Sequence, residues 1–407
     1  MVACKRPLTT ATTSGVSKIG YFAHRTSEKV DLMTTATPDS STTANIIPYG
    51  RQTITEDDVA AVVSALRGDY LTTGPTVAAF ERAIADAVEA EHAVAFCNGT
   101  ATLHGACYAG GLSADSLVST SSLSFAASAS CAKYVGASVD FIDIDPATLN
   151  LDPTKVNEAS DGLVAVHFAG LPVALTKLAY RPSVVIEDAA HALGASTPDG
   201  PVGNCAHSDM TSFSFHPVKP ITTGEGGIVT TNNDELAERL RRFRSHGVVR
   251  DPSQGGWYQH VEEIGYNYRL TDVQSALGLS QLRKLDEFIG RRQELAGRYD
   301  TMLAGSEVVT APQAAAGWRH GYHIYPVRVP DRRRVYEALH AERILVQVHY
   351  VPIHHHPPYR DPAHELPNTD QAYEGLLSLP IFPTLTFDEQ DRVVEALLRI
   401  VGDTANG

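Results

Sequence analysis

The chain has 407 residues, and 43% of them are hydrophobic, so it is long enough to bury the cores of two domains. Its formal net charge of -14 argues against a general affinity for nucleic acids or anionic membranes, because both recruit lysine and arginine. No apolar run approaches the roughly 20 residues that cross a bilayer. We therefore expect small-molecule partners, with no nucleic acid and no membrane.

Residues 1–45 are rich in Ser and Thr and have little apolar patterning, which predicts a disordered extension. Their composition also suits an organelle transit peptide, although they lack the apolar centre of a signal peptide. Translation starting at Met33 is a third interpretation. The five cysteines show no CxxC spacing, which indicates neither a disulfide framework nor a zinc site and fits a cytoplasmic protein.

From Ile46 onward the pattern is typical of an α/β enzyme. Seven short apolar runs predict buried strands, at residues 93–98, 116–121, 139–145, 162–168, 183–189, 209–215 and 226–231. Helices predicted over residues 100–109 and 126–135 separate some of these runs, which indicates a mostly parallel sheet with helices on both faces. The last two runs leave no room for a helix between them, so one strand there can be antiparallel.

Beyond Thr271 the pattern changes to a long helical tract that reaches about Leu303. Two further strand candidates, HGYHIYPVRV and ILVQVHYVP, then alternate with helices. We therefore predict a large domain of residues 46–290 and a smaller C-terminal α/β domain of residues 291–407.

Ligands in such sheets gather outside the carboxyl ends of the strands. The first strand ends in NGTATLHGA, where small residues open a helix whose free N–H groups can hold a phosphate. Other strand ends supply the ring of Phe125, then Asp188 with His191, and then Ser214 with Lys219. A phosphate cradle, an aromatic ring, an acid, an imidazole and an amine are what pyridoxal phosphate requires.

Lys219 stands between two prolines, which stiffen the chain while the four-carbon stem still moves. Such a lysine can form a Schiff base with the cofactor and then act as an acid–base catalyst. Taken singly, each residue has a simpler explanation: a surface lysine, an Asp that caps a turn, a packing histidine or a core phenylalanine. Their joint placement at one sheet edge favours the cofactor site.

The run HHH at residues 354–356 is compatible with metal binding. It lies in a proline-rich loop without a matching cysteine or acidic cluster, so we expect no metal.

The motifs NGTA, EDAAH, SFHPVK with TTGEGG, and GYNYRLTD resemble those of the DegT-type nucleotide-sugar aminotransferases. The resemblance runs from about residue 48 to about residue 400. It implies the fold type I architecture of pyridoxal-phosphate enzymes. The stretches IPYGRQ, DYLTTGP, FRSHG, ALGLSQL and QVHYVPIH resemble one subgroup in particular, the UDP-4-amino-4,6-dideoxy-N-acetyl-β-L-altrosamine transaminases of the pseudaminic acid pathway.

The resemblance implies a role for each matching position. Lys219 would bind the cofactor covalently, Asp188 would pair with the ring nitrogen, and His191 would lie near the 3-hydroxyl group, where many relatives have Gln. The phosphate would be held by Thr100, Ala101 and Ser214, with Gly99 allowing close approach. Phe125 would face the ring, although Leu123 and Ser124 before it are less typical. The sugar nucleotide would contact Tyr49, Leu71, Thr72, Gln347, His349 and Tyr350.

In relatives, the asparagine of GYNYR reaches the phosphate of the neighbouring subunit, so Asn267 implies a homodimer with shared active sites. The expected reaction moves an amino group from L-glutamate to C4 of a UDP-linked 4-keto-6-deoxy sugar. Three alternatives stay open: a transaminase for another dTDP- or UDP-keto sugar or a ketocyclitol, a dehydratase on the same scaffold, and a sensor without catalysis. Lys219 disfavours the dehydratase, whose known members have histidine there.

Overall fold

The computed structural model describes residues 46–360 and 365–405. These residues belong to one compact unit that begins at Ile46. The expected N-terminal extension lies outside the described residues, and the division near residue 290 stays a prediction. Among the described residues, no helix combines the length and the apolar composition needed to cross a membrane.

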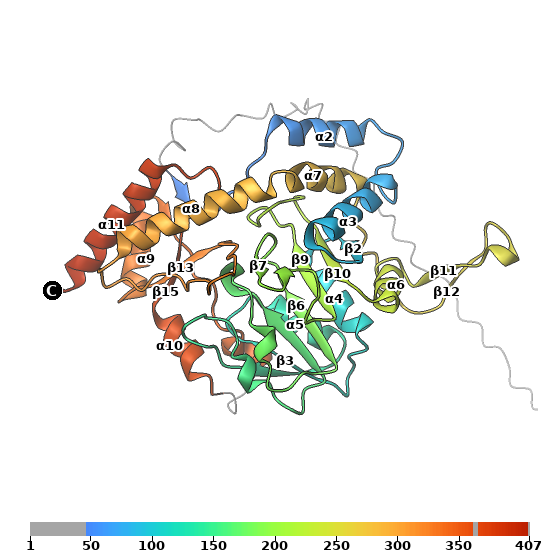
Figure 1. Cartoon of the computed structure of the whole chain (residues 1–407), viewed down its shortest axis with the longest axis horizontal. Helices are drawn as coiled ribbons and strands as arrows, with labels where there is room; N and C mark the ends of the chain where they lie inside the picture. Colours follow the sequence, from blue (N-terminus) through green and yellow to red (C-terminus); the bar gives the residue numbers. More distant parts are fainter. Residues whose placement is uncertain (1–45, 361–364, 406–407) are drawn as a thin grey trace, which may run out of the picture. The chain divides into compact units, whose positions relative to one another are not determined.

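A seven-stranded sheet lies at the centre of this unit (Figure 1). Its strands, in chain order, are β2 His92–Phe96, β3 Leu117–Ser121, β4 Ser138–Ile142, β5 Gly162–Val166, β6 Val184–Asp188, β9 Met210–Ser214 and β10 Gly227–Thr231. The order across the sheet is β2-β10-β9-β6-β5-β3-β4. Only β10 is antiparallel to its neighbours β2 and β9, and the other pairs are parallel. The predicted mostly parallel sheet is confirmed.

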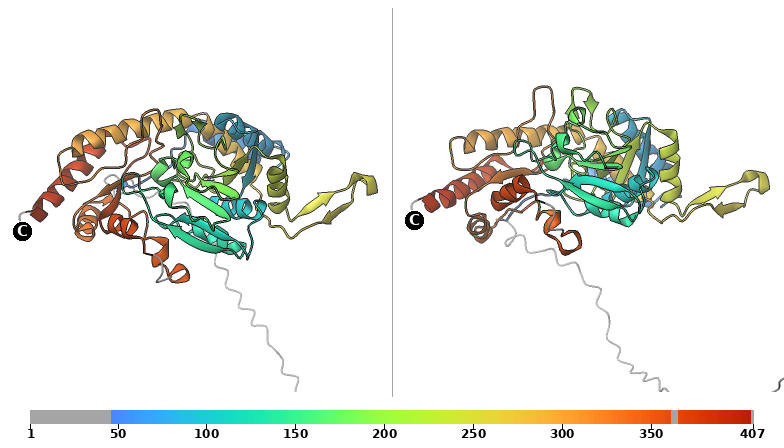
Figure 2. Two further views of the ribbon diagram at one scale, coloured as in Figure 1. Left: turned by 60° about the horizontal axis from the view of Figure 1, so that its bottom comes forward. Right: turned by 90° about the horizontal axis from the view of Figure 1, so that it is seen from below.

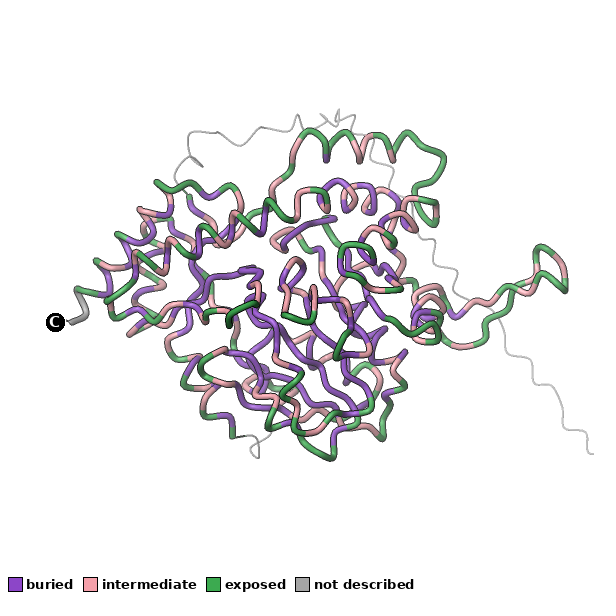
Figure 3. The backbone as a smooth tube through the Cα atoms, in the orientation of Figure 1, coloured by how far each residue is buried: buried purple, intermediate pink, exposed green. Residues whose placement is uncertain are grey.

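Helices cover both faces of the sheet, as expected for a fold type I enzyme. Along β2 the side chains alternate: Val94 and Phe96 pack in one core cluster with α4 and α6, whereas Ala93 and Ala95 pack in another with α3. The helices before residue 290 are α2 Glu56–Leu66, α3 Pro75–Val88, α4 Gly99–Ala109, α5 Ala127–Tyr134, α6 Asp234–Phe243 and α7 Asp272–Leu282. Most residues in the strands of the sheet are buried (Figure 3).

The long helical tract that begins after Thr271 consists of two helices, α7 and α8 Leu285–Leu303. A capping box formed by Thr271 and Gln274 begins α7, and Arg283 and Lys284 interrupt the tract before α8. Figure 1 shows the two helices following one another along one side of the unit.

The C-terminal segment differs from the prediction in its strands. Its elements are α9 Arg332–Ala341, α10 Pro367–Gly375, α11 Phe387–Ala405, β13 Tyr325–Arg328, β14 Ile344–Leu345 and β15 Leu376–Leu379. The two predicted strands lie in separate two-stranded sheets, because β13 pairs with β15 and β14 pairs with β1 Ile47–Pro48. The run after β14 leaves this pairing and makes only a single bridge, from Gln347 to Ser378. The sequence analysis did not predict β15, because a run of four residues, LLSL, is too short to distinguish a strand from a helix.

Two small hairpins complete the described elements. One consists of β7 Ser196–Thr197 and β8 Gly200–Pro201. The other, β11 Val248–Arg250 with β12 Gln259–Val261, extends away from the rest of the unit in both views of Figure 2.

Candidate active site

A cavity of about 450 Å³ lies where the strands of the central sheet end. Its walls come mainly from the segments that follow β2, β3, β6 and β9, and from Tyr49, His323, His349 and Tyr350. The sequence-predicted residues that line it are Tyr49, Gly99, Thr100, Phe125, Asp188, His191, Ser214, Lys219, His349 and Tyr350. Residues that are up to 301 positions apart in the sequence, Tyr49 and Tyr350, thus line one cavity.

The start of α4 forms one end of the cavity. Asn98 caps this helix, and its Oδ1 accepts a hydrogen bond from the Ala101 N–H at 2.8 Å. A Cβ atom added at Gly99 would lie 2.8 Å from Cβ of Ser214, so only glycine fits between α4 and the end of β9. Gly99, Thr100 and Ser214 line the cavity, whereas Ala101 does not. The first amides of the helix and a hydroxyl group therefore form an anion cradle, but the Ala101 amide is used by the cap.

Asp188 ends β6 and is only 5% exposed. Its Oδ2 accepts a hydrogen bond from Oγ of Ser128 at 2.6 Å, and its Oδ1 accepts one from the Ala190 N–H at 3.2 Å. Ser128 in turn pairs with Ser124 at 2.7 Å between the hydroxyl oxygens. These contacts fix the carboxylate at the cavity wall, where it can pair with a cationic ring nitrogen.

Lys219 lies in the connection between β9 and β10. Its backbone N–H donates to the His216 carbonyl at 2.9 Å, which closes a turn inside the Pro-flanked motif. Burial, opposed by the negative charge of Asp188, lowers the pKa of Lys219 to about 8. A lysine with this pKa is partly neutral near pH 7 and can act as a nucleophile and as a base.

Three histidines surround this part of the cavity. The rings of His191 and His323 lie 4.4 Å apart, and His191 Nε2 lies 3.1 Å from the Tyr350 hydroxyl. Burial and the charge of Lys219 lower the pKa of His191 and of His323 well below the ordinary value, and lower that of His349 to about 3. The imidazoles are therefore neutral.

These residues fit pyridoxal phosphate. The buried Nδ1 atoms of His191 and His323 have no hydrogen-bond partner within the described part of the chain, and both residues line the cavity. The cavity also combines an anion cradle, a fixed carboxylate, an amine and the Phe125 ring, which is 59% exposed. Each polar part of the cofactor can thus find a matching group.

Sequence reasoning missed His323 and Ser128, which contact Lys219 and Asp188. The only signal for His323 was its place inside a strand candidate, HGYHIYPVRV. Nothing in the sequence singled out Ser128, because small polar residues are common at the start of helices.

Several predicted residues do not line this cavity within the single chain. Thr72 bridges Thr271, and the Leu71 carbonyl accepts from the Asp272 N–H at 3.0 Å, so both lie near the start of α7. Gln347 is exposed and bridges Ser378. Asn267 forms a backbone bridge with Ser245. Their predicted contacts with ligands stay predictions.

The sequence matches a known protein family along most of its length. The profile of the DegT/DnrJ/EryC1/StrS aminotransferase family matches residues 52–398. The spore coat polysaccharide biosynthesis protein SpsC of Bacillus subtilis is 35% identical over 381 residues, which cover 88% of this chain and 97% of that protein. The UDP-4-amino-4,6-dideoxy-N-acetyl-beta-L-altrosamine transaminase of Campylobacter jejuni is 34% identical over 379 residues, which cover 89% and 99%.

Solved structures give the same result. Helicobacter pylori PseC, an aminotransferase involved in the biosynthesis of pseudoaminic acid, superposes with a TM-score of 0.81 and 29% identity, covering 88% of this chain and 100% of that chain. The sugar aminotransferase CalS13 of Micromonospora echinospora superposes with a TM-score of 0.80 and 31% identity, covering 87% and 100%.

Proposed function

The chain belongs to the DegT/DnrJ/EryC1/StrS aminotransferase family, whose cofactor is pyridoxal phosphate, and we propose that it aminates a nucleotide-linked keto sugar. The amino group moves from L-glutamate to C4 of a UDP-linked 4-keto-6-deoxy-N-acetylhexosamine, giving UDP-4-amino-4,6-dideoxy-N-acetyl-β-L-altrosamine. The partly neutral Lys219 in one cavity with Asp188 supports the amino transfer. The altrosamine transaminases of Campylobacter jejuni, 34% and 35% identical to the chain, support the substrate.

Pyridoxal phosphate would be held by residues of the cavity wall. Gly99, Thr100 and Ser214 would hold its phosphate, and Phe125 would face its ring. Asp188 would pair with the ring nitrogen, and Lys219 would bind the aldehyde. When bound, pyridoxal phosphate withdraws electrons from the carbon that carries the amino group.

Lys219 moves the proton in both half-reactions. Its free Nζ takes a proton from the α-carbon of L-glutamate in the first half. In the second half it delivers a proton to C4 of the sugar, which becomes the carbon that carries the amino group. A pKa of about 8 suits both tasks, because the amine gains and loses a proton readily near neutral pH. Two separate half-reactions predict ping-pong kinetics.

Tyr49, His349 and Tyr350 form the part of the cavity wall that faces the sugar. The rings of Tyr49 and His349 lie 5.2 Å apart, and those of His349 and Tyr350 lie 4.9 Å apart, so the three rings make one contiguous surface. A neutral imidazole and phenol groups suit sugar hydroxyls and a keto oxygen. We also propose that the sugar nucleotide contacts Leu71, Thr72 and Gln347, which do not line the cavity of the single chain.

We further propose a homodimer in which each subunit completes the active site of its partner. The β11–β12 hairpin projects from the rest of the unit (Figure 2). In this hairpin and the segment after it, Trp257 is 85% exposed and Ile264 is 82% exposed. Exposed large apolar side chains on one segment favour burial against another surface. The segment leads directly to Asn267, which does not line the cavity of its own chain. In the proposed dimer, Asn267 binds the cofactor phosphate in the active site of the partner subunit.

A substrate panel tests the proposed function. Purified protein with pyridoxal phosphate and L-glutamate is incubated with UDP- and dTDP-linked 4-keto and 3-keto sugars, and NMR identifies the amino sugar. We expect C4 amination of the UDP-linked 4-keto-6-deoxy-N-acetylhexosamine, with one 2-oxoglutarate per product. A faster reaction with another keto sugar would show that this sugar is the substrate instead. This outcome is relevant because SpsC is as similar to the chain as the altrosamine transaminases are. A product that has lost a hydroxyl group without gaining nitrogen would overturn the aminotransferase assignment.

A further inference from the structure

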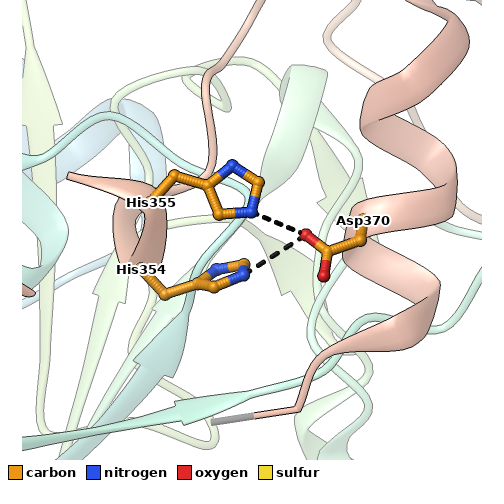
Figure 4. A group of neighbouring side chains, drawn as sticks. All are labelled: His354, His355 and Asp370. Atoms are coloured by element: carbon orange, nitrogen blue, oxygen red, sulfur yellow. Dashed lines mark hydrogen bonds and ion pairs between the residues drawn. The ribbon is translucent and has the colours of Figure 1, made fainter. Parts of the chain in front are cut away.

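Two histidines and one aspartate form a compact cluster outside the cavity (Figure 4). His354 and His355 belong to the short helix η5 Ile353–His355, and Asp370 lies in the first turn of α10. Both imidazoles reach toward the same carboxylate oxygen, as Figure 4 shows. The Asp370 Oδ1 atom lies 3.2 Å from His354 Nε2 and 2.9 Å from His355 Nε2.

These separations are close to those in a metal site. Zinc binds imidazole nitrogen and carboxylate oxygen at about 2.0–2.2 Å with tetrahedral geometry, which separates neighbouring ligand atoms by about 3.3 Å. One ligand atom from each of the three residues lies within 4.8 Å of the others. The two histidine–aspartate distances, 3.2 and 2.9 Å, are already close to this separation, so rotation of the side chains would let a cation replace the protons that now join the three groups.

Two residues that follow strands of the central sheet, Ser122 after β3 and Asp143 after β4, fix the positions of the ligands. His354 is 8% exposed, its Nδ1 lies 2.6 Å from the Ser122 hydroxyl, and its backbone N–H donates to the same oxygen at 3.1 Å. The start of α10 is fixed by Asp143, whose carboxylate accepts hydrogen bonds from the Thr369 N–H and hydroxyl at 2.9 and 2.8 Å. A hydrogen bond to the second ring nitrogen is typical of metal-binding histidines.

The outer side of the cluster is open to solvent. The side chain of His355 is 38% exposed and that of Asp370 is 48% exposed. A cation can therefore reach the ligands, and water can occupy a fourth position. The sequence argument against a metal rested on the missing acidic partner of the HHH run, and Asp370 supplies that partner from 15 residues further along the chain.

We propose that His354, His355 and Asp370 form a site for one divalent cation of the zinc type. Two imidazoles and one carboxylate favour Zn²⁺ over Mg²⁺ or Ca²⁺, which prefer oxygen ligands. The ion joins η5 to α10 and, through Ser122, to the end of β3. Tyr350 precedes η5 and Phe125 follows β3, so the ion supports two elements that carry side chains of the cavity wall.

Zinc titration of the full chain tests this site. Tag-free holoenzyme is treated with chelator, dialysed and titrated with ZnCl₂ by calorimetry, and bound zinc is counted by mass spectrometry. We expect one Zn²⁺ per chain. His355→Ala and Asp370→Asn remove partly exposed ligands, so the variants can fold, and each should weaken binding by about 100-fold. The matched control is His356→Ala, which changes the third histidine of the run and should leave affinity unchanged.

Two results would overturn the site. One is the absence of zinc from the wild-type chain at 100 μM free Zn²⁺. The other is equal affinity of His355→Ala, Asp370→Asn and the wild type, because the zinc would then bind elsewhere. Circular dichroism of the metal-free variants checks their folding, and the cofactor absorption spectrum checks that zinc has not bound at the active site. Cobalt substitution gives a further readout, since a tetrahedral Co²⁺ spectrum should appear in the wild type and in His356→Ala only.

Discussion

The Nζ atom of Lys219 lies 3.5 Å from Nε2 of His323, a residue 104 positions later in the chain. Burial first, and then the charge of Lys219, lowers the pKa of His323 well below its ordinary value. The neutral imidazole can accept a hydrogen bond from Nζ when its proton is on Nδ1. His323 can thus hold the Lys219 amine in position when it is not bound to the cofactor, and we infer that His323 is a positioning residue.

Replacing His323 should slow catalysis without removing it. A hydrogen bond to a charged group contributes about 1.5–3 kcal/mol, so His323→Ala should lower kcat about 10- to 100-fold. KM for the keto sugar should change little, because His323 acts on Lys219. Steady-state kinetics measures this split, His323→Gln should recover part of the loss, and His207→Ala on the surface is the control. A kcat of His323→Ala within twofold of the wild type would show that His323 does not contribute to catalysis.

The lowered pKa of Lys219 predicts how the apoenzyme takes up its cofactor. Only the neutral amine attacks an aldehyde, so uptake should accelerate as the pH rises and level off above about 8. At pH 7 a pKa of 8 leaves about a tenth of the amine neutral, whereas an ordinary lysine would have about three parts in ten thousand. Stopped-flow absorbance from pH 6 to 10 measures the midpoint. A midpoint near 10 would mean that burial does not lower this pKa.

Asp188→Asn should keep the size of the side chain but remove its charge. The ring nitrogen of the cofactor then loses its anionic partner, and turnover should fall by about 100-fold or more, roughly 3 kcal/mol of transition-state stabilisation. Single-turnover kinetics with glutamate measures the loss, and Asp199→Asn in an exposed loop is the control. Near-normal turnover would show that Asp188 does not support the electron withdrawal.

Mixed dimers test whether Asn267 acts across the subunit boundary. Lys219→Ala and Asn267→Ala chains should each be impaired alone. Under subunit exchange, each heterodimer should contain one site with both residues intact, so activity should return toward half that of the wild type. Activity assays of separately tagged and co-purified heterodimers measure the recovery.

The complementation experiment needs two controls. Mass measurement must demonstrate the heterodimers, and mixing two differently tagged Lys219→Ala chains must give no activity. Persistent inactivity of demonstrated heterodimers would place Asn267 in the site of its own subunit. It would also remove the main argument for shared active sites.

The sequence was most informative where local pattern determines structure. The seven strands of the sheet were predictable because each is a short apolar run with turn residues at its ends. The placement of Asp188 and Lys219 followed as well, because the carboxyl ends of neighbouring parallel strands meet at one edge. The C-terminal strands β13, β14 and β15 were not predictable in their pairing, because each is short and its partner is distant in sequence.

The sequence by itself therefore determined the sheet, the lysine motif and the family resemblance, since these depend on local composition and on residues near each other in the chain. Only the tertiary structure brought His323 to Lys219, and Asp370 to His354 and His355. In both cases the packing of the folded chain brings together residues from different segments. A single sequence contains no local signal for such contacts. The same packing decided the pKa of Lys219, because burial is a property of the folded chain.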